Sequence, residues 1–169
     1  MKHTRDIWIC LPLMLAANCV QAQTVAPTDT DLRSIYCVQI LQSEIGEEKA
    51  GQAQLENSLK QAQIPSTQKF LKDQLDDVTK WLANAESALE RLQSYVLPRW
   101  MNFDPVPALL AMNRGKDDWQ AFGAMTRKCS AQCSALASGD KLAACWASCP
   151  DKDLVARVQG CLHPTWLPF

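Results

Sequence analysis

Histidine is nearly absent from the sequence, although its side chain is the one whose charge changes most readily near neutral pH. Two histidines occur among the 169 residues. Only His163 remains if the N-terminal segment discussed below is removed, and it lies in a C-terminal tail between Leu162 and Pro164. A lone histidine in a tail is more often incidental than catalytic. The composition therefore gives no starting point for acid–base catalysis.

The short motifs of common enzyme classes are missing as well. The sequence contains no G-x-S-x-G nucleophile motif, no glycine-rich phosphate loop and no H-E-x-x-H zinc motif. Carboxylates are plentiful, but those in the long N-terminal half fit the solvated faces of helices; they are Glu44, Glu47, Glu48, Asp73, Asp76 and Asp77. We therefore predict no catalytic residues, no cofactor and no metal, in a protein that is not an enzyme.

The sequence also lacks an excess of positive charge and a second long apolar run. Removal of Lys2, Arg5 and Asp6 with the N-terminal segment reduces the 17 Lys and Arg residues to 15 and the 18 Asp and Glu residues to 17, a net charge of −2. A chain without a basic excess does not attract phosphate backbones, so nucleic-acid binding is not expected. No later apolar run approaches the ~20 residues needed to cross a bilayer, so we expect no membrane span in the mature chain.

The sequence does contain an export signal, at residues 1–22. Lys2 and Arg5 give a positive start, and Ile7 to Ala17 form an apolar run of 11 residues, too short to span a membrane. Val-Gln-Ala then presents small residues before the predicted cleavage after Ala22. A lipoprotein anchor on Cys19 fits the pattern less well. The mature chain of 147 residues, 23–169, is the size of one domain.

Six cysteines remain after removal of the signal, and an even number in an exported chain indicates disulfides. We therefore expect a periplasmic or secreted protein. The six are Cys37, Cys129, Cys133, Cys145, Cys149 and Cys161.

Two proline-free runs within residues 31–97 predict two long helices joined near Pro65. The second run carries apolar residues at alternating spacings of four and three, as in a coiled-coil seam: Leu71, Leu75, Val78, Leu82, Ala85, Leu89, Leu92 and Val96. Folding the first run back about Pro65 places an apolar residue opposite five of these eight. Glu48 and Gln52 interrupt the first seam, either as edge residues that reach water or as a polar notch that sets the register or receives a ligand. The runs predict a long antiparallel hairpin.

The remainder of the chain divides at changes of composition. Residues 98–118 are rich in proline and aromatic residues, and we expect a connector with a short helix near Val106 to Asn113 that Gly115 stops. A new helix begins at Asp117 or Asp118. Residues 119–162 read as cysteine-rich helices and residues 163–169 as an apolar tail. No strand signal occurs, so we predict an all-α single domain in which the hairpin packs against a disulfide-stapled helical half.

The spacing of the cysteines selects one pairing. Cys129 with Cys149 and Cys133 with Cys145 share the midpoint Gly139, as two rungs of one helical hairpin must. The crossed alternative needs two registers at once. By elimination Cys37 pairs with Cys161, which places the cysteine-rich half at the end of the hairpin remote from Pro65.

Other uses of these thiols fit less well. Structural zinc sites usually contain a tighter C-x-x-C knuckle and occur in reducing compartments. Thiol–disulfide catalysts normally carry C-x-x-C after a strand, and haem attachment needs C-x-x-C-H. None of these spacings is present.

The two C-x-x-x-C pairs, with 11 residues between them, resemble the module of the small Tim chaperones of the mitochondrial intermembrane space. Those proteins form a helical hairpin with nested disulfides and shield hydrophobic membrane-protein segments. The resemblance covers residues 129–149, about a seventh of the mature chain. It implies the local shape alone, because the cleavable signal and the long N-terminal hairpin depart from that family.

Aromatic residues outside the long hairpin form either the core between the two halves or anchors for a partner. We name as candidate partner contacts Trp100, Phe103, Trp166, Leu167 and Phe169. The expected function is that of an exported, disulfide-stabilised helical binding or structural protein. Examples are an accessory subunit of an envelope or secretion assembly, or an inhibitor-like partner of another exported protein. The alternative is a small helical chaperone or a thiol-redox protein that uses the twin C-x-x-x-C cysteines.

Overall fold

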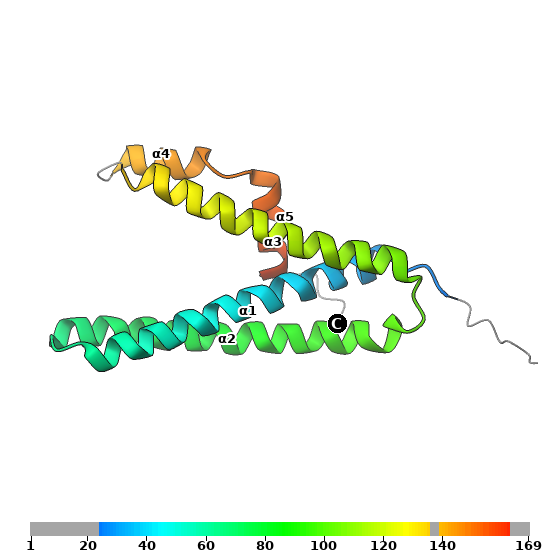
Figure 1. Ribbon diagram of the computed structural model, residues 1–169, viewed down its shortest axis with the longest axis horizontal. Coiled ribbons are helices and arrows are strands. Elements are labelled where there is room, and N and C mark those ends of the chain that lie inside the picture. Colours follow the sequence, from blue (N-terminus) through cyan, green and yellow to red (C-terminus); the bar gives the residue numbers. More distant parts are fainter. Residues whose placement is uncertain (1–23, 136–138, 163–169) are drawn as a thin grey trace, which may run out of the picture.

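A computed structural model describes residues 24–135 and 139–162. The export signal, its cleavage site and the C-terminal tail with Trp166, Leu167 and Phe169 lie outside the described residues. Within the described ranges the chain forms five helices and no β-strand, so the predicted all-α class is confirmed (Figure 1). The helices are α1 (Asp29–Gln61), α2 (Pro65–Trp100), α3 (Pro105–Cys133), α4 (Asp140–Ser148) and α5 (Lys152–Leu162).

The first two helices form the long antiparallel hairpin. Thr28 and Asp31 begin α1 with a capping box, in which each side chain accepts a hydrogen bond from the other residue's backbone N–H. Pro65 is the first residue of α2, where its missing N–H leaves no helical bond unmade. Gln52 donates a 3.1 Å hydrogen bond to Thr79, the neighbour of its predicted partner Val78, so the register is close to the one expected.

Burial of the seam differs along the hairpin. Near the N-terminus of α1 the seam is buried, with Leu41, Ile45, Leu82 and Leu92 in the main core. Toward Pro65 the seam residues are only half-buried, because α3 diverges from α1 and no third helix covers this part in Figure 1. The outer half of the hairpin therefore projects as a two-helix arm.

The connector differs from the expectation. A single helix, α3, runs through Gly115, where the sequence predicted a stop between two shorter helices. Gly115 is buried where α3 crosses α1, and a β-carbon there would lie 2.7 Å from the backbone oxygen of Tyr36. The glycine permits close helix contact and does not end the helix. Likewise α2 continues through Pro98 to Trp100, because a proline in the last turn interrupts only the end of the ladder.

The C-terminal half docks through α5 near the N-terminal part of α1, as the predicted Cys37–Cys161 bond requires, whereas α4 and the C-terminal part of α3 point toward the Pro65 side of the molecule in Figure 1. Cys37 on α1 is bonded to Cys161 on α5 across 124 residues of sequence, and both residues are buried in the main core. Figure 1 shows α3 and α4 as a second pair of helices that diverges from the α1–α2 pair, with α5 between them. The fold thus consists of two helical hairpins that are joined at the α1–α3 crossing, where α5 packs against both helices.

Candidate functional site

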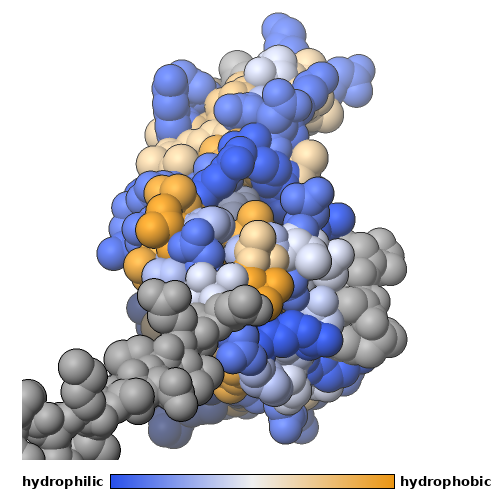
Figure 2. Space-filling view, turned by 90° about the vertical axis from the view of Figure 1, so that its right-hand side faces the viewer, coloured by the Kyte–Doolittle hydropathy of each residue, from blue (hydrophilic) through white to orange (hydrophobic). Residues whose placement is uncertain are grey.

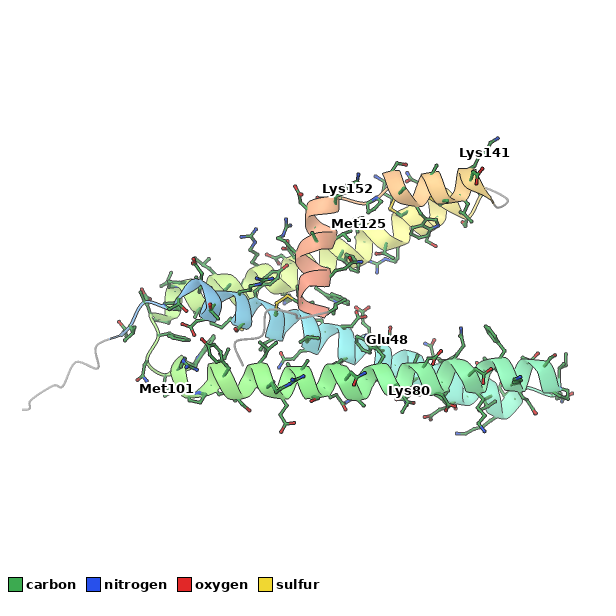
Figure 3. The ribbon with its side chains drawn as sticks, turned by 180° about the vertical axis from the view of Figure 1, so that it is seen from behind. Glu48, Lys80, Met101, Met125, Lys141 and Lys152 are labelled. Carbon is green, nitrogen blue, oxygen red and sulfur yellow. A yellow bond between two sulfur atoms is a disulfide. The ribbon has the colours of Figure 1, made fainter. Side chains whose placement is uncertain are left out.

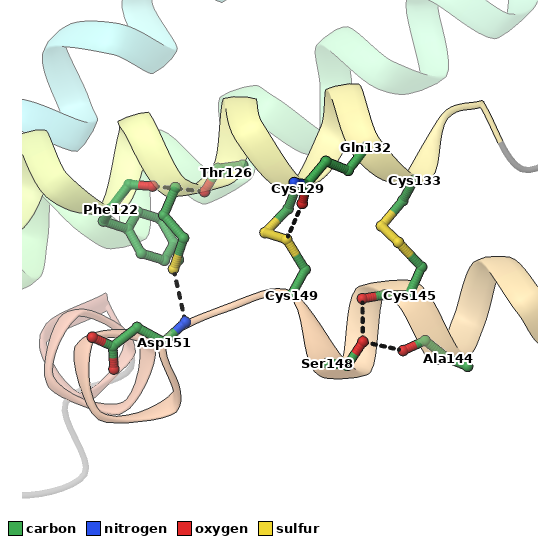
Figure 4. Close-up of a disulfide and its surroundings, with 11 residues drawn as sticks. Phe122, Thr126, Cys129, Gln132, Cys133, Ala144, Cys145, Ser148, Cys149 and Asp151 are labelled. Atoms are coloured by element: carbon green, nitrogen blue, oxygen red, sulfur yellow. Dashed lines mark hydrogen bonds between the residues drawn. A yellow bond between two sulfur atoms is a disulfide. The ribbon is translucent and has the colours of Figure 1, made fainter.

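The two C-x-x-x-C pairs form nested rungs between α3 and α4, as the shared midpoint predicts. Cys129 is bonded to Cys149 and Cys133 to Cys145, with Cα–Cα distances of 5.6 and 5.7 Å (Figure 4). The two cysteines of α3 are buried, and Cys145 of α4 and Cys149, the residue that follows this helix, are half-buried. Each thiol of one pair is bonded to the opposite helix, so neither C-x-x-x-C forms a disulfide within itself.

The two disulfides are the main attachment of α4 to the rest of the molecule. This helix has nine residues and none of them is buried, and its N-cap, Gly139, makes no side-chain capping bond. Trp146, which lies on α4, is 41% exposed. An isolated helix of this length is marginal in water, so the two disulfides hold α4 in place. Among the described residues, no three His, Cys, Asp or Glu side chains are grouped so that they could hold a metal ion.

A polar junction joins three helices around Asp118. Its carboxylate accepts hydrogen bonds from the Tyr36 hydroxyl of α1 and from Nε of Arg157 of α5, each at 2.9 Å. Burial alone would raise the pKa of Asp118, but the bonds from Arg157 and Tyr36 outweigh it and lower that pKa. Burial, followed by the bond to Asp118, raises the pKa of Tyr36 to about 12. The junction fixes α5 against α1 and α3.

Beside this junction lies an open groove of about 660 Å³ between α1, α3 and α5, hereafter the α1–α3–α5 groove. Arg33, Arg114 and Arg157 contribute to its lining. The apolar residues of its lining are Leu32, Pro107, Leu110, Ala111 and Ala156, together with the buried Cys37 and Cys161.

Exposed apolar side chains gather at the end of the molecule where α2 turns into α3, hereafter the α2–α3 end. Met101 lies at this turn in Figure 3 and is 85% exposed. Figure 2 faces this end and shows orange apolar patches between hydrophilic side chains. The large apolar residues that are exposed here are Val25, Leu97, Met101, Val106, Leu109 and Leu110.

A hollow of about 250 Å³ adjoins this patch between α1, α2 and α3. Leu97, Trp100 and Met112 line it together with other apolar side chains, and three glutamines, Gln39, Gln42 and Gln93, also contribute. Phe103 lies beneath the patch in a second small core with Ile35, Val96 and Ala108. Backbone hydrogen bonds from Val25 to Asn102 and from Asp104 to Val25 tie the N-terminal lead to the same turn.

The two candidate partner contacts within the described residues, Trp100 and Phe103, lie in different environments. Trp100 is half-buried and lines the hollow, whereas Phe103 is 7% exposed and packs inside the second core. Sequence reasoning concentrated on aromatic residues and missed the aliphatic ones. The spacing of Val106, Leu109 and Leu110, at i, i+3 and i+4 on α3, was the signal that they share one helix face.

Three glutamates form an acidic face on α1 next to Trp119, whose indole N–H donates a 3.0 Å hydrogen bond to Glu47. Trp119 is buried in the main core. Burial, followed by repulsion from Glu48 and Glu47, raises the pKa of Glu44 to about 7. The face contains no base or nucleophile partner among the contacts seen in the described residues.

Comparison of the chain with protein-family models, with curated proteins and with solved structures gives no significant match. Of the helices that the structure describes, none combines the length and apolar character required to cross a membrane. The functional assignment therefore depends on the geometry of this chain alone.

Proposed function

We propose that this chain is an exported, disulfide-stabilised helical binding protein that docks another exported protein through its α2–α3 end. An accessory subunit of an envelope or secretion assembly, or an inhibitor-like partner, would use such a surface. The observation that carries the proposal is the gathering of six exposed apolar side chains beside the hollow that Trp100 lines.

Two physical features favour docking at this end. Exposed apolar side chains that gather in one region among polar residues are typical of protein interfaces. The hollow has the size and apolar lining to receive one side chain of a partner, and anchors of this kind dominate binding energy at interfaces. The glutamines at its lining supply amide groups for hydrogen bonds with the partner.

The disulfides support a role in holding shape in an oxidising compartment. Cys37 and Cys161 are 0% and 2% exposed, so no reductant reaches their sulfurs without local opening. The alternative, a chaperone or thiol-redox protein, is favoured by the half-buried Cys145 and Cys149, the most exposed of the six disulfide-bonded cysteines. A free-thiol count on the native protein distinguishes the two. A count of zero agrees with a structural role, and two or four labile thiols would favour the redox alternative.

The docking surface is tested by charge insertion. Leu97→Glu with Met101→Glu places two carboxylates on the α2–α3 end, and Phe70→Glu is the matched control because Phe70 is a 59% exposed apolar residue at the far end of the hairpin. The oxidised chain is used to capture proteins from the exported fraction, and the partner is then used for reciprocal capture. We expect the wild type and the control to retain the partner and the double variant to lose it. A partner that all three proteins retain equally would overturn the assignment of the surface.

Export is tested separately by N-terminal sequencing of the chain recovered from the extracytoplasmic fraction. We expect the mature protein to begin at Gln23. A full-length chain that stays in the cytoplasm would contradict the proposed localisation.

A further inference from the structure

The two-helix arm consists of residues 50–61 of α1 and 65–80 of α2, which α3, α4 and α5 leave uncovered in Figure 1. At its tip Ile64 and Phe70 are 62% and 59% exposed. The apolar seam residues of the arm are only half-buried; they are Leu55, Leu59, Leu71, Leu75 and Val78. Two helices cannot enclose a seam from all sides, so the arm keeps apolar surface that a further helical layer would bury.

The two faces of the arm differ in polarity. On one face Gln52 donates its hydrogen bond to Thr79. At the base of the arm, on the same face, Lys49 forms a 2.6 Å ion pair with Glu86. The residues on the opposite face follow from helical spacings of three and four on the other side of the seam. Along it lie the uncharged residues Gly51, Leu55, Ser58, Phe70, Gln74 and Val78. This second face is the one suited to packing.

Charge is divided between the tip and the middle of the arm. Residues 56–72 contain three lysines and one acidic residue, whereas the flanking residues 44–49 and 73–77 contain six acidic residues and one lysine. Lys69 and Lys72 precede Asp73 and Asp76 by one turn each, which is the less favourable order for an ion pair within a helix. Within the described residues, none of these four side chains forms an ion pair. Their charges are therefore available to a second molecule.

This pattern of charge is complementary to itself when one arm is reversed against another. In the register that places Lys69 of one copy opposite Asp76 of the other, Lys72 also lies opposite Asp73, and two-fold symmetry repeats both pairs. A parallel arrangement would place like charges together. We propose that the protein forms a symmetric dimer in which two arms pack antiparallel through their uncharged faces, as a four-helix bundle.

The same register brings apolar side chains together. Phe70 of one copy lies opposite Leu75 of the other, so the exposed ring at the tip reaches the half-buried seam. Removal of both from water favours association. This inference does not depend on the proposed function, because the arm and the α2–α3 end share no residue and lie at opposite ends of the long hairpin.

The first test measures the mass of the oxidised chain by sedimentation equilibrium over a wide range of protein concentration. We expect the apparent mass to rise from one chain toward two. Phe70→Glu should stay monomeric and still retain any partner captured by the α2–α3 end. Val106→Glu is the matched control, because Val106 is a 61% exposed apolar residue outside the arm, and it should dimerise as the wild type does. A wild type that stays monomeric at every concentration, or a dimer that Phe70→Glu leaves intact, would overturn the proposal.

The second test exchanges the charges. Lys69→Asp with Lys72→Asp makes the tip acidic, and Asp73→Lys with Asp76→Lys makes the middle basic. Each double variant places like charges opposite each other in its own dimer, so we expect its dissociation constant to rise about tenfold or more. An equimolar mixture of the two variants restores opposite charges across the interface and should dimerise about as tightly as the wild type.

A control variant and a folding measurement accompany this exchange. Lys116→Asp with Lys128→Asp reverses two exposed charges on α3 and should leave the dimer unchanged. The thermal unfolding midpoint of each variant establishes that it is folded. A mixture that stays monomeric, or equal weakening by the control, would overturn the antiparallel arrangement of the arms.

Discussion

At the scale of single residues, Glu44 shows how local burial makes this protein sensitive to pH. Its carboxyl group is partly buried on α1, with Glu47 and Glu48 on the next turn. Burial and then the two neighbouring carboxylates raise its pKa from 4.5 to about 7. A group with a raised pKa binds its proton more tightly in the folded chain than in the unfolded chain. Around neutral pH, the ionised form of Glu44 therefore opposes folding.

Replacement of Glu44 by glutamine should stabilise the protein in a pH-dependent way. Below pH ~4.5 the glutamate is protonated in both states, so the variant and the wild type should unfold alike. As the pH rises through 7 the wild type loses stability, and Glu44→Gln should then be more stable by about 1 kcal/mol, after allowance for solvent screening. Urea unfolding at pH 4 and pH 8 measures the difference. Glu56→Gln, an exposed position on the same helix, is the control. Equal effects of the two variants at pH 8 would contradict the explanation.

At the scale of elements, the crossing of α1 and α3 depends on Gly115. The absence of a side chain at this position lets the backbones of the two helices approach, with Tyr36 and Gln39 of α1 directly opposite. The same contact brings Asp118, one turn later on α3, to the Tyr36 hydroxyl. The groove and the polar junction both follow from this single close approach.

Gly115→Ala should therefore destabilise the protein, although alanine normally favours a helix. Its β-carbon would lie 2.7 Å from a backbone oxygen and 3.1 Å from Gln39 Cβ, so the helices must separate. We expect a loss of about 1–3 kcal/mol, the usual cost of overpacking. Gly46→Ala is the matched control, because no atom lies within 4 Å of its added β-carbon. That control should gain about 0.5–1 kcal/mol in urea unfolding. A gain in both variants would show that the crossing tolerates a side chain.

The elements also show what the sequence could predict. The α1–α2 hairpin and the nested disulfides follow from periodicity and from a shared midpoint, which are local or symmetric properties of the chain. The continuity of α3 does not follow from the sequence, because a glycine such as Gly115 is expected both where a helix ends and where two helices cross closely. The groove and the α2–α3 end depend on the angle of that crossing and on where α5 docks. Those contacts join residues far apart in sequence, which spacing rules do not reach.

At the scale of the whole molecule, the three disulfides act over different ranges. Cys37–Cys161 spans 124 residues and joins the first helix to the last inside the main core. Cys129–Cys149 and Cys133–Cys145 span 20 and 12 residues and hold a helix that buries no residue of its own. The first bond constrains most of the unfolded chain, and the other two constrain a short segment at the C-terminal end of α3.

Removal of the long-range disulfide and removal of the two short-range disulfides should therefore reduce stability in different ways. Cys37→Ala with Cys161→Ala should lower the free energy of unfolding by about 4–5 kcal/mol on the chain-entropy estimate for a loop of this length. Replacement of Cys129, Cys133, Cys145 and Cys149 by serine should leave the main unfolding transition nearly in place. Instead, residues 140–148 should lose amide protection in hydrogen exchange, because a nine-residue helix that has no buried residue is marginal in water. If the quadruple variant loses as much global stability as the Cys37/Cys161 pair, the two helical hairpins unfold as one cooperative unit, and α4 contributes to the core packing that its exposure argues against.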